Sequence, residues 1–406
     1  MMHKILLSVL MSCMIISCAS LKKPETEEEL KLAEFDKFIK DIENEYAYLD
    51  TRIDEVNCIK ETYRNEAIHL SNVNEHVLFY ETILMELWDS HVQLNTNVKD
   101  SYRVDYTIYS EFEDNFTKVK NIWQTQLNPL PKENIIDAEL ISFNGTPFQY
   151  MIDSFPTICH DKQNPEVRTW IGNKILSGKR TEPRVVTLKL SSGDTITIDI
   201  DALKVVEEKS NLSYKRIGNI AYIRINNSLG EQGLVEDFNL ALNTLMNTEA
   251  LILDLRNTEA GGNTGVAKPI IGRFISEKKA TQLYENKKEK YFGYVKPTGT
   301  TYTKPVYVLV NRWTASMGEG MAIAFDGMNR AQIIGTEMNG LRGGMRGFKF
   351  LTKDYSYVLS FEKIFHIEGT PREDFVPDVY VRQTQLNEDE IFNKALEMIK
   401  SKGVQR

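Results

Sequence analysis

The sequence has few cysteines, prolines and glycines for its length. Its 406 residues include 4 Cys, 12 Pro and 23 Gly, which excludes a disulfide-rich, collagen-like or low-complexity chain. It has no long basic run, and acidic residues outnumber basic ones by 57 to 49. We therefore expect no nucleic-acid partner. The sequence also lacks CxxC and His-rich spacings, so we expect neither a metal site nor a cofactor.

Long hydrophobic runs are also scarce, and the one strongly apolar segment lies at the extreme N-terminus. Residues 5–16 are too few to span a bilayer but fit the core of a signal peptide. Ile15-Ile16-Ser17-Cys18 is similar to the lipobox of bacterial lipoproteins. We predict a signal peptide over 1–17, a lipid on Cys18 and a polar linker over 18–29, which would anchor the protein to a membrane of the bacterial cell envelope. The alternative is an ordinary signal peptide that happens to contain cysteine.

Cys58 and Cys159 are the two cysteines that remain after this segment. They could pair in an oxidising envelope or be buried thiols. Two cysteines in a chain of this length are no disulfide framework, so we favour buried thiols.

Hydrophobic spacing divides the rest of the chain into three regions. Residues 30–100 carry apolar residues at helical spacing and predict a helical cap. Residues 101–208 alternate with period two around turns such as Asn144-Gly145, and they predict a β-rich domain. In residues 209–406 strands alternate with helices, which predicts an α/β core with a largely parallel sheet.

Ser316 lies between a predicted buried strand, 306–310, and a predicted helix, 317–328. Its hydroxyl would then lie at the carboxyl edge of the sheet, beside the free N–H groups of the first helical turn. Acyl transfer needs such a nucleophile, because the oxyanion must meet donors as it forms. The competing interpretation is an ordinary helix N-cap, where serine is favoured.

Gly261 and Gly262 follow another predicted buried strand. Glycine lets a backbone N–H approach a ligand closely, so the pair could supply an oxyanion donor or could simply form a tight turn. We expect Arg256 and Glu319 to be structural, each in a buried ion pair near the site.

Taken together, motifs along the chain resemble the C-terminal processing peptidases, the tail-specific protease family that includes the tricorn core protease. The motifs, in order, are Trp88-Asp89-Ser90-His91, the PDZ-like segment 138–147, Asp254-Leu255-Arg256 before Gly261-Gly262, Thr314-Ala315-Ser316, Ile334-Gly335-Thr336, Gly369-Thr370-Pro371 and Pro377-Asp378-Val379. The resemblance implies a ClpP/crotonase-like α/β protease core, with the helical cap before it and the β-rich domain as a PDZ-like insert.

The family activates its serine in two ways. One branch uses a Lys in a downstream Gly-Lys-Gly segment, but residues 335–344 contain no Lys. Arg342 cannot replace it, because a guanidinium does not lose its proton in proteins.

The tricorn-like branch uses a His from the N-terminal helical segment, with a neighbouring Ser and a distant Glu. The resemblance therefore implies Ser316 as nucleophile, His91 as base, and Ser90 as the link from His91 to Glu373. Other candidates for the last role are Glu368 and Glu362. The implied oxyanion donors are the N–H of Met317 and that of Gly261 or Gly262.

These features predict a serine endopeptidase that cleaves unfolded or extended polypeptides at the cell envelope, with the substrate added as a strand beside the sheet. The alternative is a non-catalytic lipoprotein that binds a peptide or an apolar ligand on the same fold. An α/β-hydrolase esterase is disfavoured, because Thr314 and Gly318 flank Ser316 where that fold requires Gly-x-Ser-x-Gly.

Overall fold

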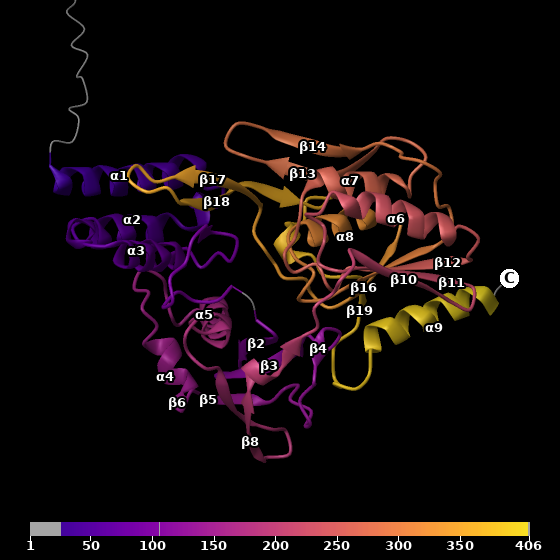
Figure 1. Cartoon of the computed structure of the whole chain (residues 1–406), viewed down its shortest axis with the longest axis horizontal. Coiled ribbons are helices and arrows are strands. Elements are labelled where there is room, and N and C mark those ends of the chain that lie inside the picture. The colour runs from indigo at the N-terminus through magenta and orange to yellow at the C-terminus, as the bar shows by residue number, and fades with distance from the viewer. Residues whose placement is uncertain (1–25, 105, 405–406) are drawn as a thin grey trace, which may run out of the picture.

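The computed structural model describes residues 26–104 and 106–404 (Figure 1). The predicted signal peptide, Cys18 and nearly all of the linker lie outside these residues. In the described part, no helix is both long and apolar enough to cross a membrane.

Three helices form the N-terminal region, and their apolar faces pack together. Thr26 and Glu29 make a capping box at the start of the first helix, with both hydrogen bonds at 3.1 Å, which satisfies N–H groups that the helix leaves free. The helices are α1 (Glu27–Glu45), α2 (Ile53–Tyr63) and α3 (Val73–Glu86), with short 3-10 turns at η1 (Leu49–Thr51) and η2 (Ala67–His69).

Cys58 and Cys159 form a disulfide, so the expectation of buried thiols is wrong. Cys58 lies on α2, and Cys159 lies in a loop of the β-rich region. Glu86, at the end of α3, accepts the backbone N–H groups of Ile158 at 2.7 Å and Cys159 at 2.8 Å. These tertiary contacts hold the loop against the helices, and composition cannot show them.

The β-rich region contains a sheet of order β2-β3-β5-β7-β8, with β6 paired to β5. Strands β7 and β8 form a hairpin around Gly193, and Val186 pairs with Ile198 in it. The strands are β2 (Ile108–Glu113), β3 (Phe116–Ile122), β5 (Glu139–Phe143), β6 (Thr146–Pro147), β7 (Val185–Lys189) and β8 (Thr195–Asp199). The other elements are β4 (Leu127–Asn128), β9 (Lys204–Val205), α4 (Phe148–Asp153), α5 (Pro165–Ser177) and η3 (Ile200–Ala202).

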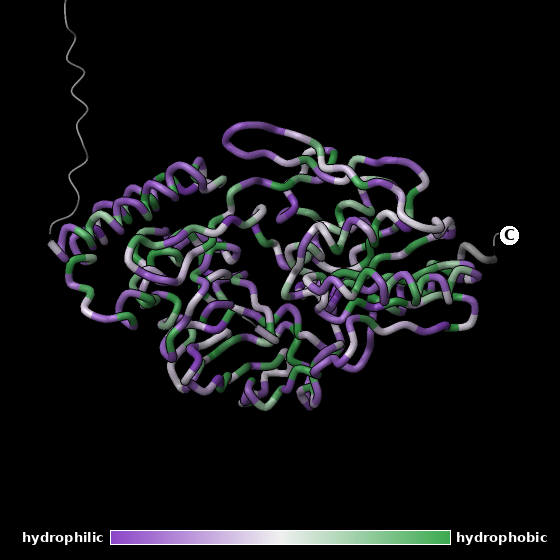
Figure 2. Tube along the Cα trace, turned by 45° about the horizontal axis from the view of Figure 1, so that its top comes forward, coloured by the Kyte–Doolittle hydropathy of each residue, from purple (hydrophilic) through white to green (hydrophobic). Residues whose placement is uncertain are grey.

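The core sheet has the order β10-β11-β12-β15-β16-β19 and is parallel except for β10. Helices α6, α7 and α8 pack on one face and α9 on the other, and Figure 2 shows hydrophobic residues along the central strands. The strands are β10 (Leu212–Ile217), β11 (Ile220–Ile225), β12 (Ala250–Asp254), β15 (Val306–Val310), β16 (Gln332–Gly335) and β19 (Val379–Tyr380). The helices are α6 (Gly233–Thr244), α7 (Thr264–Gly272), α8 (Met317–Gly327) and α9 (Glu390–Val404).

A second sheet connects the core to the N-terminal helices, and Figure 1 shows its strands crossing between them. In this sheet β1 is antiparallel to β18, with Gln93 opposite Val358 and Leu94 opposite Tyr357. Because β1 begins two residues after His91, this pairing holds the histidine close to the core. The strands are β1 (Gln93–Leu94), β13 (Lys279–Glu285), β14 (Lys290–Val295), β17 (Gly344–Lys349) and β18 (Ser356–Phe365), and η4 (Arg372–Asp374) follows.

Candidate active site

Ser316 occupies a strained turn between β15 and α8. Its φ of 49° and ψ of −105° are uncommon for a residue with a side chain, and such strain concentrates at functional sites. The buried carboxylate of Glu319 accepts the Ser316 N–H at 2.7 Å. A strained strand-to-helix turn exposes the serine hydroxyl in the same way as a nucleophile elbow.

The glycine pair lies directly beside this turn. A Cβ on Gly261 would be 2.7 Å from Ser316 Cβ, 3.2 Å from Ser316 Oγ and 3.6 Å from the Met317 nitrogen. The N–H of Gly261 already donates to Thr258 O at 2.9 Å. The N–H groups of Gly262 and Met317 have no hydrogen-bond partner within residues 26–104 and 106–404. Gly262 and Met317 are therefore the donors left for an oxyanion.

Thr258 holds the glycine segment against the serine turn, and the sequence analysis missed it. Its N–H donates to Trp313 O at 3.2 Å. The hydroxyls of Thr258 and Thr314 both donate to Leu255 O, at 2.8 and 3.0 Å. A Cβ on Gly318 would come within 2.2 Å of Thr258 Oγ1, so glycine is required there. The sequence signal for this close contact is Gly318 itself, a residue without a side chain two positions after Ser316.

His91 is 4% exposed and follows α3 in a short turn. Its Nδ1 lies 2.8 Å from the carbonyl oxygen of Arg342. Because a carbonyl oxygen only accepts, Nδ1 carries the proton, and in the neutral ring Nε2 keeps its lone pair. The His91 backbone N–H donates to Asp89 Oδ1 at 2.9 Å. This tautomer is the one that a general base needs.

Burial and the positive charge of Arg372 lower the pKa of His91 below its ordinary value of 6.5, while the Asp89 carboxylate opposes them. The imidazole is therefore neutral at pH 7 and can accept a proton.

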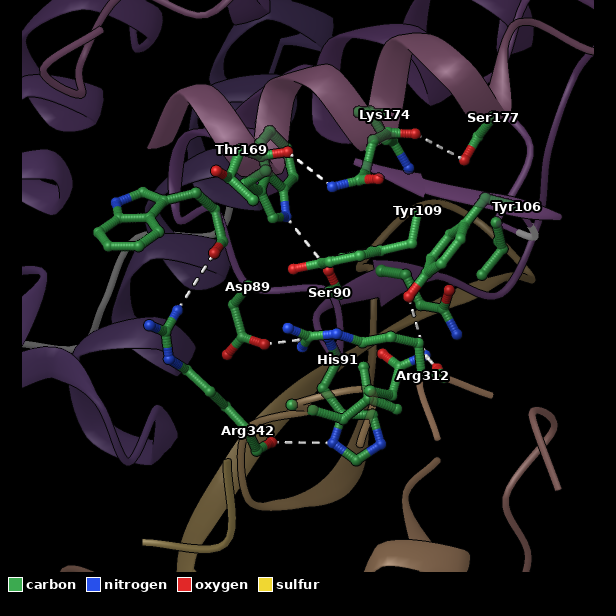
Figure 3. Close-up of a pocket in the computed structure, with 18 of the residues that line it drawn as sticks. Asp89, Ser90, His91, Tyr106, Tyr109, Thr169, Lys174, Ser177, Arg312 and Arg342 are labelled. Atoms are coloured by element: carbon green, nitrogen blue, oxygen red, sulfur yellow. Dashed lines mark hydrogen bonds between the residues drawn. The ribbon is translucent and has the colours of Figure 1, made fainter. Parts of the chain in front are cut away.

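Ser316 and His91 line the same cavity, which has a volume of about 810 Å³. Its walls come from the helical region, the β-rich region and the core, and Figure 3 shows α5 on one side and His91 on the other. No hydrogen bond joins the two side chains. Catalytic hydrogen bonds are often long before substrate binds and then tighten, so this arrangement is compatible with proton transfer.

The structure differs from the predicted chain of contacts through Ser90 and Glu373. The indole N–H of Trp170, on α5, donates to Ser90 Oγ at 3.2 Å. The Glu373 carboxylate instead lies near Tyr48, whose pKa is raised by burial and by that negative charge. Glu373 Oε2 has no hydrogen-bond partner among the described residues. A backbone carbonyl, that of Arg342, therefore orients His91 here.

The two other glutamate candidates also have no hydrogen bond to His91 among the described residues. Glu362 Oε2 accepts the hydroxyl of Tyr291 at 2.9 Å, and the backbone N–H of Glu368 donates to His366 Nδ1 at 3.3 Å. Neither contact reaches His91.

Glu319 is fully buried and forms the expected ion pair, but its partner, Arg372, escaped the sequence analysis. Arg372 Nε lies 3.9 Å from Glu319 Oε2. Burial raises the pKa of Glu319 to about 7, against the opposing effects of Arg372 and of the N–H groups of Gly340 and Ser316.

Arg256 also forms its expected buried ion pair. Its guanidinium lies 2.7 Å from Asp254 Oδ2 and 2.6 Å from Asp389 Oδ1. The Arg256 carbonyl accepts the indole N–H of Trp123 at 3.1 Å, which connects the β-rich region to the core. Within the described part of the chain, no group of three or more His, Cys, Asp or Glu residues could hold a metal ion.

Residues 219–381 match the sequence profile of Peptidase family S41. These residues form a peptidase family S41 domain. The tail-specific protease of Haemophilus influenzae is 29% identical over 168 residues, which is 40% of this chain and 24% of that protease. The match therefore spans about a quarter of the curated relative.

Solved structures resemble nearly the whole chain. Mature CPAF has a TM-score of 0.62 at 12% identity, covering 92% of this chain and 96% of that one. The photosystem II D1 C-terminal processing protease has a TM-score of 0.57 at 15% identity, covering 88% of this chain and 95% of that one. A lipoprotein from Streptococcus agalactiae has a TM-score of 0.51 at 13% identity, covering 91% of this chain and 96% of that one. At these identities the likeness confirms the predicted α/β fold with its helical N-terminal region.

The S41 domain contains only part of the candidate site. Ser316, Gly262 and Arg372 lie within the matched residues, whereas His91 and Ser90 come from the preceding helical region. Ser316 and His91 therefore line one cavity only when the helical region docks on the S41 domain through β1 and β18.

Proposed function

We propose that this protein is a serine endopeptidase. The observation that carries the proposal is the strained Ser316 turn beside two free N–H groups, facing the same cavity as a histidine whose Nε2 is available. Acyl transfer requires this combination of nucleophile, base and oxyanion donors.

In the proposed reaction, Ser316 Oγ attacks the peptide carbonyl while His91 Nε2 takes the hydroxyl proton. The N–H groups of Gly262 and Met317 donate to the oxyanion, where preorganised donors contribute most. The imidazolium, stabilised by the Arg342 carbonyl and the Asp89 carboxylate, then gives its proton to the leaving amine. Water attacks the acyl-enzyme with His91 again as base, and Ser316 regains its proton.

We infer that the substrate is an unfolded or extended polypeptide. The cavity lies between three parts of the molecule, and a folded domain could not bring a peptide bond to Ser316 without unfolding locally. Aromatic side chains of the cavity wall offer apolar contact area; they include Tyr106, Tyr109, Phe112, Trp170 and Trp313.

Labelling with a fluorophosphonate tests this function directly. Wild-type protein should be labelled at Ser316 and should hydrolyse a reduced, unfolded protein, whereas Ser316→Ala should do neither. Ser401→Ala, a change at an exposed position of helix α9, is the matched control and should behave as wild type. Hydrolysis that survives Ser316→Ala would remove Ser316 from the mechanism.

A non-catalytic peptide-binding protein on the same fold is the second candidate. The observations that favour it are the missing Ser316–His91 hydrogen bond and the separation of Glu373 from the imidazole. Wild-type protein that binds an unfolded peptide but shows neither hydrolysis nor labelling would establish this alternative.

We further propose that the protein is exported and anchored to a membrane of the bacterial cell envelope through a lipid on Cys18. The sequence pattern of residues 1–18 supports this, and so does the Cys58–Cys159 disulfide, because disulfides persist in oxidising compartments. Cys18→Ser should abolish incorporation of a fatty-acid probe in cells. Cys13→Ser, within the predicted signal peptide, should leave labelling intact.

A further inference from the structure

Arg372 is a buried arginine that the proposed mechanism does not use. It is 3% exposed and lies in η4, between the serine turn and the loop 340–343. Its guanidinium donates to three carbonyl oxygens, those of Leu341 at 2.6 Å, Gly343 at 2.8 Å and Ser316 at 3.4 Å. One planar group therefore contacts the main chain of the nucleophile and of the loop opposite it.

Glu319 makes the complementary contacts from the other side. It is fully buried, and its two carboxylate oxygens accept the N–H of Ser316 at 2.7 Å and that of Gly340 at 2.8 Å. Its Oε2 lies 3.9 Å from Arg372 Nε, within ion-pair distance but too far for a hydrogen bond. The same pair of residues thus holds both the N–H and the C=O of Ser316.

The loop held by this ion pair also carries the partner of His91. The Glu319–Arg372 pair contacts Gly340, Leu341 and Gly343, while the carbonyl of the remaining residue, Arg342, accepts the His91 Nδ1–H. His91 and Ser316 share no direct hydrogen bond, so their relative placement depends on how the loop sits on the serine turn.

We propose that Arg372 is a positioning residue which, with Glu319, sets the alignment of His91 with Ser316 by clamping the loop 340–343 to the serine turn. The proposal rests on the proposed serine peptidase function. Neither residue touches the reacting atoms; both act through the main chain.

The chemistry of arginine is specific to this task. A guanidinium presents donors in a rigid planar fork and can reach several carbonyls at once, whereas the lysine ammonium is a compact charge on a flexible stem. A buried ion pair is also weak evidence for stability, because burying both charges removes much of the gain. Positioning of the main chain explains why Arg372 contacts three carbonyl oxygens, whereas an ion pair that only stabilised the fold would not require these contacts.

Arg372→Lys and Arg372→Ala test the clamp, with Arg382→Lys as the matched control. Arg382 is an exposed arginine that pairs with Asp137, away from the cavity. We expect Arg372→Lys to lower kcat at least tenfold with KM within twofold and with the wild-type midpoint of thermal unfolding. Millimolar guanidinium, but not ammonium, should restore part of the kcat of Arg372→Ala. Arg382→Lys should match wild type.

A readout that does not need activity separates this proposal from the proposed function. The His91 Nδ1–H proton, held by Arg342 O, should give an exchange-protected NMR signal that is absent from His91→Ala. That signal should weaken in Arg372→Lys and persist in Arg382→Lys. If wild type neither hydrolyses peptides nor reacts with a fluorophosphonate, the peptidase function fails, while the signal still tests the clamp.

Two results would overturn the clamp. One is an Arg372→Lys protein with kcat within twofold of wild type and an unchanged Nδ1–H signal. The other is an Arg372→Lys protein whose loss of activity equals its unfolded fraction, so that each folded molecule keeps the wild-type kcat. A residue that only stabilises the fold would behave in this way.

Discussion

The carbonyl oxygen of Arg342 lies 2.8 Å from Nδ1 of His91, so a main-chain group selects the tautomer of the imidazole. The usual orienting partner in serine peptidases is a carboxylate. A neutral carbonyl stabilises the imidazolium less than a carboxylate would, and here burial and Arg372 also lower the pKa of His91. The histidine is thus neutral at pH 7 and can accept a proton.

As the pH falls, the first decline in kcat should come from protonation of Glu319. Its pKa of about 7 means that it takes up a proton as the pH falls through 7. The new O–H then faces the N–H of Ser316 or Gly340, and one of the two hydrogen bonds is lost. Arg372 and Glu373 also face this carboxyl, and their charges act on it in opposite directions. We expect kcat to decline below about pH 7, measured with a peptide substrate.

His91 should produce a second decline at lower pH, because its pKa lies below 6.5 and only the neutral ring can act as a base. Glu319→Gln should have a lower kcat at every pH and should retain only this second limb. A limb near pH 7 that persists in Glu319→Gln would assign it to another group.

Gly261→Ala should impair catalysis through direct contact with the nucleophile. The new methyl group would lie 2.7 Å from Ser316 Cβ, at a φ of +65° that disfavours alanine. Displacing the hydroxyl by about 1 Å costs on the order of 100-fold in rate, so kcat should fall by about that factor. Gly347→Ala is the control, because a Cβ there meets nothing within 4 Å. Equal kcat in the two variants would contradict the placement of Gly261.

Ser90→Ala separates the predicted relay from the observed contacts. The Ser90 hydroxyl accepts the Trp170 indole N–H, and Arg342 O already orients His91. The expected loss of kcat is therefore less than about tenfold, whereas deletion of a general acid–base component typically costs roughly 100- to 10,000-fold. Comparison with Trp170→Phe, which removes the same hydrogen bond from the other side, should show a similar small effect. A loss of 1,000-fold in Ser90→Ala alone would restore the relay from Glu373.

Loss of the disulfide should destabilise the protein. The bond joins α2 to the β-rich region across a sequence separation of 101, and such cross-links typically contribute roughly 2–4 kcal/mol to the free energy of unfolding. Urea unfolding of the Cys58→Ser/Cys159→Ser double variant should show this decrease. Dithiothreitol should destabilise wild type and leave the double variant unchanged; equal stability with and without the bond would contradict the expectation.

Local patterns were sufficient for the parts of the site that lie within one strand-turn-helix unit. The apolar run 306–310 followed by Ser316 predicted β15, the turn and α8, because a buried strand and a helix start each have a local signature. Gly261 and Gly262 could be placed after β12 for the same reason. No such signature distinguishes which of the two N–H groups is already bonded, since Gly261 donates to Thr258 only in the folded turn.

By itself the sequence predicted the three regions and the candidate nucleophile, because periodicity and glycine placement are properties of neighbouring residues, and the motif resemblance added the candidate base. The tertiary structure alone decided the pairing of Cys58 with Cys159, the carbonyl that orients His91, and the Glu319–Arg372 ion pair. Each of these joins segments far apart in the chain, and each depends on long-range contacts such as β1 against β18, which no local pattern encodes.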